Sequence, residues 1–386
     1  MYAAAPLSPR RRPRALLALG VLLAVLVAGC SGPDTTAPAW QPGGGGGTTS
    51  SPAPGDKPTD APAGGEITLS ATGDIVMGMA PSRLPANGGK GFFDEVKGAL
   101  EADLVMGNLE EPLTEDTGAG KCGADSTACF QFRAPPGYAA HLRDAGFELL
   151  NQANNHGYDY GKAGYENTRQ ALEEHGLKHT GAPDQITVVD VKGVKVAVLG
   201  FSSYPWSNSL TDIDAAKAVV EKAATQADVV VVQVHMGAEG ADKTRVKPGT
   251  EIFYGENRGD PVKFSHAVID AGADLVVGHG PHVLRGMEFY QGRLIAYSLG
   301  NFAGGARSLN PSGRLGWGGV LKVSLKPDGS YAGGSFTSTR MNSVGKPTMD
   351  PADQGLGLIT QVSRSDFPRT GARFDSSGKI SAPSAG

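Results

Sequence analysis

Residues 228–235 read DVVVVQVH and are almost continuously apolar. Such a run is typical of a strand in a parallel sheet that is covered on both faces. On either side of it, short apolar segments alternate with helical patterns, which predicts an α/β fold with a mainly parallel sheet. Segments 186–191 and 194–201 flank Lys192-Gly193 and predict a hairpin, so the sheet is expected to be mixed. The predicted strands are 67–71, 104–106, 148–150, 194–201, 229–234, 275–277 and 294–299, and the predicted helices are 93–101, 136–145, 162–175, 212–227 and 261–271.

The overall composition excludes several classes of protein. The 386 residues include 35 Lys and Arg against 39 Asp and Glu, which gives a formal net charge of −4. A nucleic-acid binder would show a basic excess, so no nucleic-acid partner is expected. Three cysteines are too few for a disulfide-dense mini-domain or a zinc-finger array, whereas 40% hydrophobic residues suffice for a sizeable core.

The first thirty residues have the pattern of an export signal. A cluster of arginines between Arg10 and Arg14 precedes an apolar run, 15–29, that is too short to span a bilayer comfortably. The run ends in Val-Ala-Gly-Cys, which resembles a bacterial lipobox and predicts a signal peptide over 1–29 and lipidation of Cys30; a plain secretory signal is the alternative. Residues 30–65 are rich in Gly, Pro, Ser and Thr and predict a disordered linker. The chain is therefore expected outside the cytoplasm, anchored to the cell membrane as a bacterial lipoprotein.

Polar residues of metal-ligand type follow the predicted strands. The carboxyl ends of strands in an open α/β sheet line one crevice, so residues far apart in the sequence are expected to converge there. Carboxylate, amide and imidazole groups together favour Mn, Fe or Zn. The residues concerned are Asp74, Asn108, Glu110, Asn154, Asn155, His156, His235, His279 and His282.

Each of these residues also has a purely structural interpretation. Asp74 could stabilise a turn, and Glu110 could be a solvated loop carboxylate. The stretch 154–156 could cap the helix that follows it, and His235 could be a hydrogen-bonded core histidine. The recurrence of ligand types at successive strand ends favours a metal site over these separate explanations.

Six segments with a common order and spacing point to a known family. They are GDIVMG (73–78), GNLEEPLT (107–114), ANNHGYDYG (153–161), HMGAE (235–239), GHGPH (278–282) and YSLGNF (297–302). Together they resemble the CapA family of poly-gamma-glutamate capsule synthesis proteins, within the calcineurin-like metallophosphoesterase superfamily. The resemblance spans roughly residues 67–304 and implies a metallophosphoesterase-like domain over 66–330, in which a layered, mixed β-sheet sandwich is flanked by helices.

The resemblance also implies roles for individual residues. The expected cofactors are two divalent ions, of Mn, Fe or Zn. One ion would be bound by Asp74, Glu110 and His282, and the second by Glu110, Asn155, His235 and His279. His156 would be the general acid. The residues expected to orient the ligands are Asn108, Asn154 and Asp159.

This chain departs from the superfamily at a few positions. Phosphoesterases normally carry Asp-x-His, but Val76 stands where the histidine would be, a lack that the family shares, so the first ion loses a ligand. Met236, Gly240 and Gly280 replace residues that are usually larger in the family. These changes predict a wider mouth of the pocket.

Two classes of function remain open. The chain is either a binding module in the biosynthesis, export or anchoring of a capsule polymer, or a metal-dependent, phosphoesterase-like hydrolase or transferase that acts on another cell-envelope polymer or ester. The presence of His156 favours chemistry, whereas the missing first-motif histidine favours binding. The expected partners are an anionic cell-envelope polymer such as poly-gamma-glutamate, a membrane synthetase complex, and the membrane itself through the lipid anchor.

Two regions lie outside the motifs. Cys122 and Cys129 lie in a long polar insertion, where an oxidising compartment would pair them; a metal-binding pair is the alternative. Lys121 and Arg133 in this insertion are either contacts for an anionic polymer or solvated charges. Residues 331–386 predict edge strands, among them 334–340 and 355–362, followed by a flexible tail from about residue 371.

Overall fold

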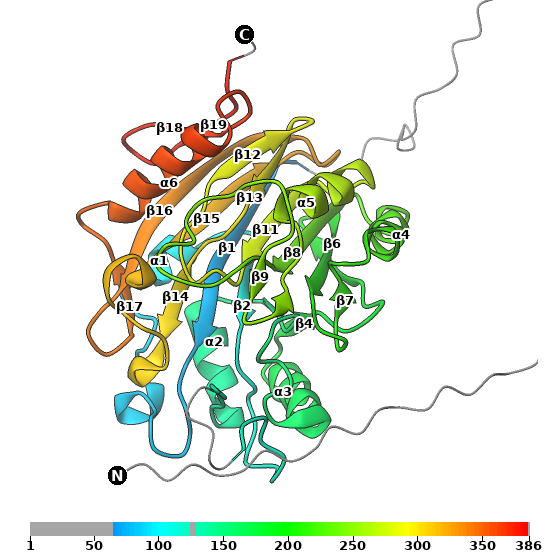
Figure 1. Ribbon diagram of the computed structural model, residues 1–386. Coiled ribbons are helices and arrows are strands. Elements are labelled where there is room, and N and C mark those ends of the chain that lie inside the picture. Colours follow the sequence, from blue (N-terminus) through cyan, green and yellow to red (C-terminus); the bar gives the residue numbers. More distant parts are fainter. Residues whose placement is uncertain (1–64, 124–128, 385–386) are drawn as a thin grey trace, which may run out of the picture. The chain divides into compact units, whose positions relative to one another are not determined.

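Two mixed β-sheets form the centre of the computed structural model, which describes residues 65–123 and 129–384 (Figure 1). The predicted signal peptide, Cys30 and almost all of the predicted linker lie outside the described residues. The 8-stranded sheet has the order β17 (Pro347–Met349), β16 (Tyr331–Met341), β15 (Trp317–Leu325), β1 (Ile67–Val76), β2 (Leu104–Leu109), β3 (Leu149–Asn151) and β4 (Lys178–Thr180), with β14 (Asn301–Gly304) paired to β1. The 7-stranded sheet has the order β12 (Met287–Tyr290), β13 (Arg293–Ala296), β11 (Leu275–His279), β8 (Val229–His235), β6 (Val194–Ser202) and β5 (Thr187–Val191), with β7 (Asn208–Ser209) paired to β6.

Each sheet combines parallel and antiparallel strands. In the 8-stranded sheet, β1 to β4 run parallel, whereas β15, β16 and β17 pair antiparallel beyond β1. In the 7-stranded sheet, β6, β8, β11 and β13 run parallel. The predicted hairpin around Lys192-Gly193 is present as β5 and β6, which pair antiparallel. The expectation of a mixed, layered α/β fold is thus confirmed.

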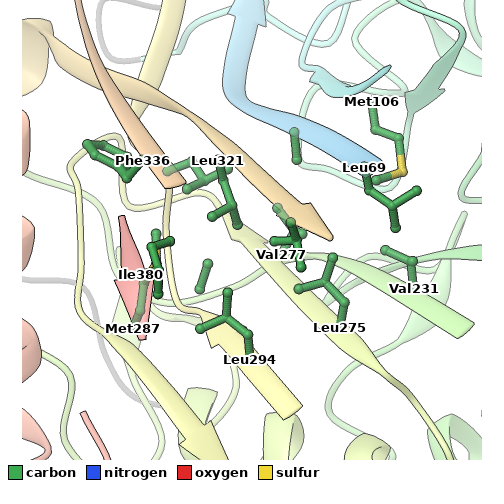
Figure 2. Packing of buried hydrophobic residues seen from close by; sticks show 14 of the residues in the cluster. Leu69, Met106, Val231, Leu275, Val277, Met287, Leu294, Leu321, Phe336 and Ile380 are labelled. Atoms are coloured by element: carbon green, nitrogen blue, oxygen red, sulfur yellow. The ribbon is translucent and has the colours of Figure 1, made fainter. Parts of the chain in front are cut away.

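The main hydrophobic core lies between the two sheets. Leu69 and Met106 from the 8-stranded sheet pack in one cluster with Val231 and Leu275 from the 7-stranded sheet, and Figure 2 shows these side chains together. All four are almost completely buried. Alternate residues of each strand point into this core, as the two-residue period of a strand requires.

Helices cover the outer faces of both sheets (Figure 1). Val230 and Val232 of β8 pack in a cluster with Val220 and Phe264 of the covering helices, while Val231 faces the other sheet. This arrangement explains why the run from 228 to 235 is apolar throughout, since β8 is buried on both faces. The helices are α1 (Lys97–Leu100), α2 (Ala139–Ala145), α3 (Gly161–Glu174), α4 (Ile213–Ala224), α5 (Pro261–Asp270) and α6 (Gln354–Asp366). None of the helices within the described ranges is long and apolar enough to cross a membrane.

The two helices that cover the 7-stranded sheet begin at capping aspartates. The carboxylate of Asp212 accepts a hydrogen bond from the Ala215 amide at 3.1 Å at the start of α4. Asp260 accepts from the amides of Val262 and Lys263 at the start of α5, where Pro261 occupies the first turn. Both helix starts agree with the sequence-based prediction, because an N-cap aspartate and an N1 proline are strong start signals.

The structure corrects the prediction of a single sheet. Asp74 lies within β1 near its end, and Glu110 and Asn155 follow β2 and β3 of the same 8-stranded sheet, whereas His235 and His279 end strands of the 7-stranded sheet. Strand ends from two packed sheets therefore converge. The sequence pattern does not distinguish a single sheet covered by helices from two packed sheets, because one face of a strand can be covered equally well by a helix or by another sheet.

The C-terminal region differs from its prediction as well. Residues 354–366 form α6 and not an edge strand, and the predicted flexible tail contains β18 (Arg373–Phe374) paired with β19 (Ile380–Ser381). Ile359 of α6 and Ile380 of β19 are buried in the core between the sheets. Burial of these side chains explains why this segment has a defined structure. β16 and β17, in contrast, form the edge of the 8-stranded sheet, in the region where edge strands are predicted.

The insertion between β2 and α2 contains a disulfide between Cys122 and Cys129. Arg133, at its end, is 6% exposed, and its guanidinium lies 5.3 Å from the centre of the Tyr160 ring. Neither predicted role fits Arg133, because a buried side chain is neither a solvated charge nor a contact for a polymer. The remaining two-stranded pair is β9 (Ile252–Phe253) with β10 (Glu256–Asn257), in the loop after β8.

Candidate metal centre

Asp74, Glu110 and His282 form the tightest group among the predicted ligands. One ligand atom from each residue lies within 4.8 Å of the others. Nδ1 of His282 is 3.2 Å from Oδ2 of Asp74, and its Nε2 is 3.7 Å from Oε1 of Glu110. Asp74 and Glu110 are fully buried. The structure thus brings together the three residues that were predicted to bind one ion.

His235 and His279 add two imidazoles from the 7-stranded sheet. Nε2 of His235 lies 3.8 Å from Oε1 of Glu110, and Nδ1 of His279 lies 4.0 Å from Oδ1 of Asp74. Asn155, the sixth predicted ligand, is buried, and its Nδ2 donates to Oε1 of Glu239 at 3.4 Å. His279 therefore adjoins a ligand assigned to the other ion, so the division of the six residues between two ions stays a prediction.

The unpaired polar atoms of the cluster fit a bound cation. Both carboxylate oxygens of Glu110, Oδ1 of Asn155 and Nδ1 of His279 are buried and have no hydrogen-bond partner among the described residues. Buried polar atoms in proteins are nearly always paired, so several unpaired atoms in one cluster need an explanation. A divalent ion would satisfy them, because carboxylate and amide oxygens and imidazole nitrogens are its usual ligands.

The charges of the cluster are consistent with this interpretation. Burial opposes ionisation of Asp74, but the hydrogen bond from His282 and the charges of His282, His235 and His279 together outweigh it and lower the pKa of Asp74 to about 2. Burial lowers the pKa of His279 to about 4, against the opposing charge of Asp74. Burial raises the pKa of Glu110 well above its usual value, and the charge of Asp74 adds to this effect. A cation would remove the repulsion between the two carboxylates and favour ionised Glu110.

A chain of buried amides holds Asp74. Nδ2 of Asn108 donates to Oδ1 of Asp74 at 2.8 Å, and Nδ2 of Asn154 donates to Oδ1 of Asn108 at 3.2 Å. Asn151, which sequence reasoning missed, also donates to Oδ1 of Asn108, at 2.9 Å. Asn108 and Asn154 lie where orienting residues were predicted. The stretch 154–156 does not cap α3, whose N-cap is Tyr160 without a side-chain hydrogen bond.

His156 is buried next to Asn155 and is held by a carboxylate. Its Nδ1 donates to Oδ2 of Asp159 at 2.7 Å. Asp159 also accepts hydrogen bonds from Nζ of Lys121 at 2.8 Å and from the amide of Phe132 at 2.7 Å, so the insertion fixes this carboxylate. Burial lowers the pKa of His156, and the charge of Asp159 opposes the shift. A histidine oriented by a carboxylate is suited to proton transfer.

Three further residues near the ligands were not found from the sequence. Gln233 of β8 accepts a hydrogen bond through Oε1 from Nε2 of His279 at 3.2 Å, which leaves Nδ1 of His279 free to bind a metal. Asn301 accepts through Oδ1 from Nδ1 of His282 at 2.8 Å. Glu239 places Oε2 3.6 Å from Nε2 of His282. One signal was available, since Gln233 is the polar residue within the apolar run 228–235.

A cavity of about 700 Å³ opens above the cluster. Its lining includes His156, Glu239 and His282, together with the exposed aromatic residue Tyr254. Two of the predicted site residues, His156 and His282, therefore face the same solvent-accessible space. This is the arrangement expected of a binding or active site.

The predicted widening of the pocket mouth has support at one of three positions. Gly240 lines the cavity, whereas Met236 is buried in the core beneath α4 and α5. Gly280 has φ +110°, and a Cβ there would lie 3.1 Å from the His235 ring. This glycine therefore permits close packing of His235.

The fold and the site together define a class of protein. It is a two-sheet α/β protein flanked by helices, with a candidate metal centre of buried carboxylates and imidazoles next to one cavity. The chain belongs to the family described as "Bacterial capsule synthesis protein PGA_cap", whose sequence model matches residues 68–306. The resemblance that the six motifs predicted is thereby confirmed.

Similar proteins include two from Bacillus. The chain is 33% identical over 260 residues to a "Capsule biosynthesis protein CapA" of Bacillus anthracis, covering 61% of this chain and 59% of that protein. It is 32% identical over 256 residues to a "PGA biosynthesis protein CapA" of Bacillus subtilis (strain 168), covering 61% of this chain and 63% of that protein. The matches thus span about three fifths of the length of these relatives.

Among solved structures, a putative 5'-nucleotidase from Staphylococcus aureus in complex with alpha-ketoglutarate is similar, with a TM-score of 0.41 and 14% identity over 77% of this chain and 58% of that one. A 5'-nucleotidase precursor from Thermus thermophilus gives a TM-score of 0.40 and 15% identity over the same shares. At this degree of similarity the two structures say nothing about what this chain binds.

Proposed function

We propose that this chain binds divalent metal and acts in the biosynthesis, export or anchoring of an anionic capsule polymer of the poly-gamma-glutamate type. Family membership supports the capsule role, and the names of the Bacillus relatives point the same way. The observation that carries metal binding is Glu110, a fully buried carboxylate with two unpaired oxygens that faces His235 and His282. The proposed partners are the polymer and a membrane synthetase complex.

A second candidate function is hydrolysis of a cell-envelope ester or another polymer, favoured by the His156–Asp159 pair beside the cavity. A bound divalent ion would lower the pKa of water and neutralise charge on the reacting group. His156, held through Nδ1 by Asp159, would donate a proton to the leaving-group oxygen. General acid catalysis of this kind contributes about 10² to 10⁴ in rate.

Elemental analysis and an assay of phosphodiester hydrolysis, each applied to three variants, test both functions. Glu110→Ala should abolish stoichiometric metal, because it removes the carboxylate shared by the predicted ligand groups. His156→Ala should retain metal and reduce hydrolysis of a generic phosphodiester by about 10² to 10⁴. His266→Ala, on α5 and hydrogen-bonded to Glu288, is a matched control that should change neither property.

The outcomes separate the two candidates. Wild-type protein without stoichiometric metal after exposure to Mn, Fe and Zn would refute the metal site. Metal binding together with full capsule formation by His156→Ala would leave the binding module as the function and exclude acid catalysis by His156.

We also propose that the protein is a lipoprotein anchored through Cys30 outside the cytoplasm, on the basis of the Val-Ala-Gly-Cys sequence. Cys30→Ser should move the protein from the membrane fraction to the soluble fraction and abolish incorporation of radiolabelled lipid. Continued membrane retention with unchanged labelling would exclude this anchor.

A further inference from the structure

A buried arginine lies against the metal centre. Arg258, which follows β10, is 2% exposed. Its guanidinium carbon is 5.6 Å from the centre of the Tyr204 ring and 5.5 Å from that of Phe253. These ring faces stabilise a cation.

Hydrogen bonds fix the position of this guanidinium. Nε donates to Glu256 at 3.1 Å, and one terminal nitrogen donates to Oε1 of Glu239 at 2.7 Å. The backbone is held too, because the Arg258 amide donates to the Glu251 carbonyl and the Gly237 amide donates to the Arg258 carbonyl, both at 2.9 Å. The charge cannot move away without breaking several contacts.

The other terminal nitrogen of Arg258 lies 3.4 Å from Nε2 of His235. A guanidinium only donates hydrogen bonds, so Nε2 of His235 must offer its lone pair to Arg258. That lone pair is what a metal ion would need. The ring proton then resides on Nδ1, which is buried and has no hydrogen-bond partner among the described residues, so neither nitrogen of His235 offers a lone pair to an ion.

We propose that Arg258 takes the place of a second metal ion. The site then holds one divalent ion, bound by Asp74, Glu110 and His282 with Nδ1 of His279 beside Asp74, and the guanidinium supplies the second positive charge beside His235 and Glu239. A second divalent ion is disfavoured, because it would compete for His235 and lie close to a permanent positive charge. This inference rests on the proposed metal binding and refines the number of ions.

The stoichiometry of bound Mn²⁺ in the full-length protein tests the inference. The wild type should bind one ion per chain at saturation, and His235→Ala should still bind one, whereas a site with two ions would lose one of them. Arg258→Met should bind two, because it frees His235 and Glu239. The double variant Arg258→Met, His235→Ala should return to one, and Arg258→Lys, which keeps the charge, should remain at one.

The results that would contradict the role of Arg258 differ from the result that would contradict metal binding itself. Two ions in the wild type, or one ion in a folded Arg258→Met, would overturn the role of Arg258 and leave metal binding intact. No ion in the wild type would refute the proposed function itself. If Arg258→Met does not fold, electron paramagnetic resonance of the Mn²⁺-loaded wild type decides, since two ions about 3.5–4 Å apart would be magnetically coupled and a single ion would not.

Discussion

Individual residues of the site are predictable where a motif marks them. The motifs named Asp74, Glu110 and His282, and the structure places these three together. Their roles as metal ligands stay predictions until an ion is measured. Arg258 could not be assigned from the sequence, because it lies outside the six motifs and follows no predicted strand, whereas Asn301 lies in the YSLGNF motif but was given no role. Such residues act through contacts between segments that are far apart in the chain.

Gln233 is expected to position His279 for metal binding. Its Oε1 accepts the Nε2 proton, so Nδ1 keeps the lone pair. Gln233→Met preserves the volume and removes the acceptor, and it should weaken metal affinity by about 10 to 100-fold, the usual effect of losing such a partner. Metal titration by calorimetry measures this. Gln233→Glu, which keeps an acceptor, should bind more tightly than Gln233→Met, and equal affinities would exclude the positioning role.

At the scale of elements, the insertion between β2 and α2 supports the segment that carries His156. Lys121 donates from its side chain to the Asp159 carboxylate and from its amide to the Asp159 carbonyl, each at 2.8 Å. The disulfide begins at the next residue, Cys122, whose amide donates to Gln131 at 2.9 Å. The sequence predicted the cysteine pairing and singled out Lys121 as a polymer contact or a solvated charge, but not its hydrogen bond to Asp159.

Replacement of both Cys122 and Cys129 by serine should loosen this segment. Without the cross-link, Lys121 and Phe132 hold Asp159 less firmly, so the amides of residues 155–160 should exchange with solvent faster than in the wild type. Hydrogen exchange followed by mass spectrometry measures the change, with α5 as an internal reference. Unchanged exchange over 155–160 would show that the disulfide does not support the site.

The wrong prediction for α6 has a local cause. Gly355 and Gly357 lower helix propensity, and alternating Leu356 and Leu358 imitate the period of a strand. The segment is helical because Ile359 and its neighbours pack into the core between the sheets. Tertiary burial of this kind commonly outweighs propensity.

For the molecule as a whole, the sequence predicted the class and the family but only part of the layering. Strands, helices and the hairpin of β5 and β6 follow from hydrophobic periodicity and turn residues. The resemblance, and not the periodicity, indicated a sandwich. The two-sheet arrangement matters for the site, because Asp74 and Glu110 come from one sheet, whereas His279 ends β11 of the other sheet and His282 follows it. Metal binding would therefore link the two layers.

An anomalous diffraction map of crystals soaked in Mn²⁺ tests the central claim most directly. The account predicts a peak enclosed by Asp74, Glu110 and His282, at the group whose ligand atoms lie within 4.8 Å of one another. Glu110→Ala crystals treated identically should lack the peak. Absence of a peak at this position in the wild type, or a peak elsewhere only, would contradict the assignment of this cluster as a metal centre.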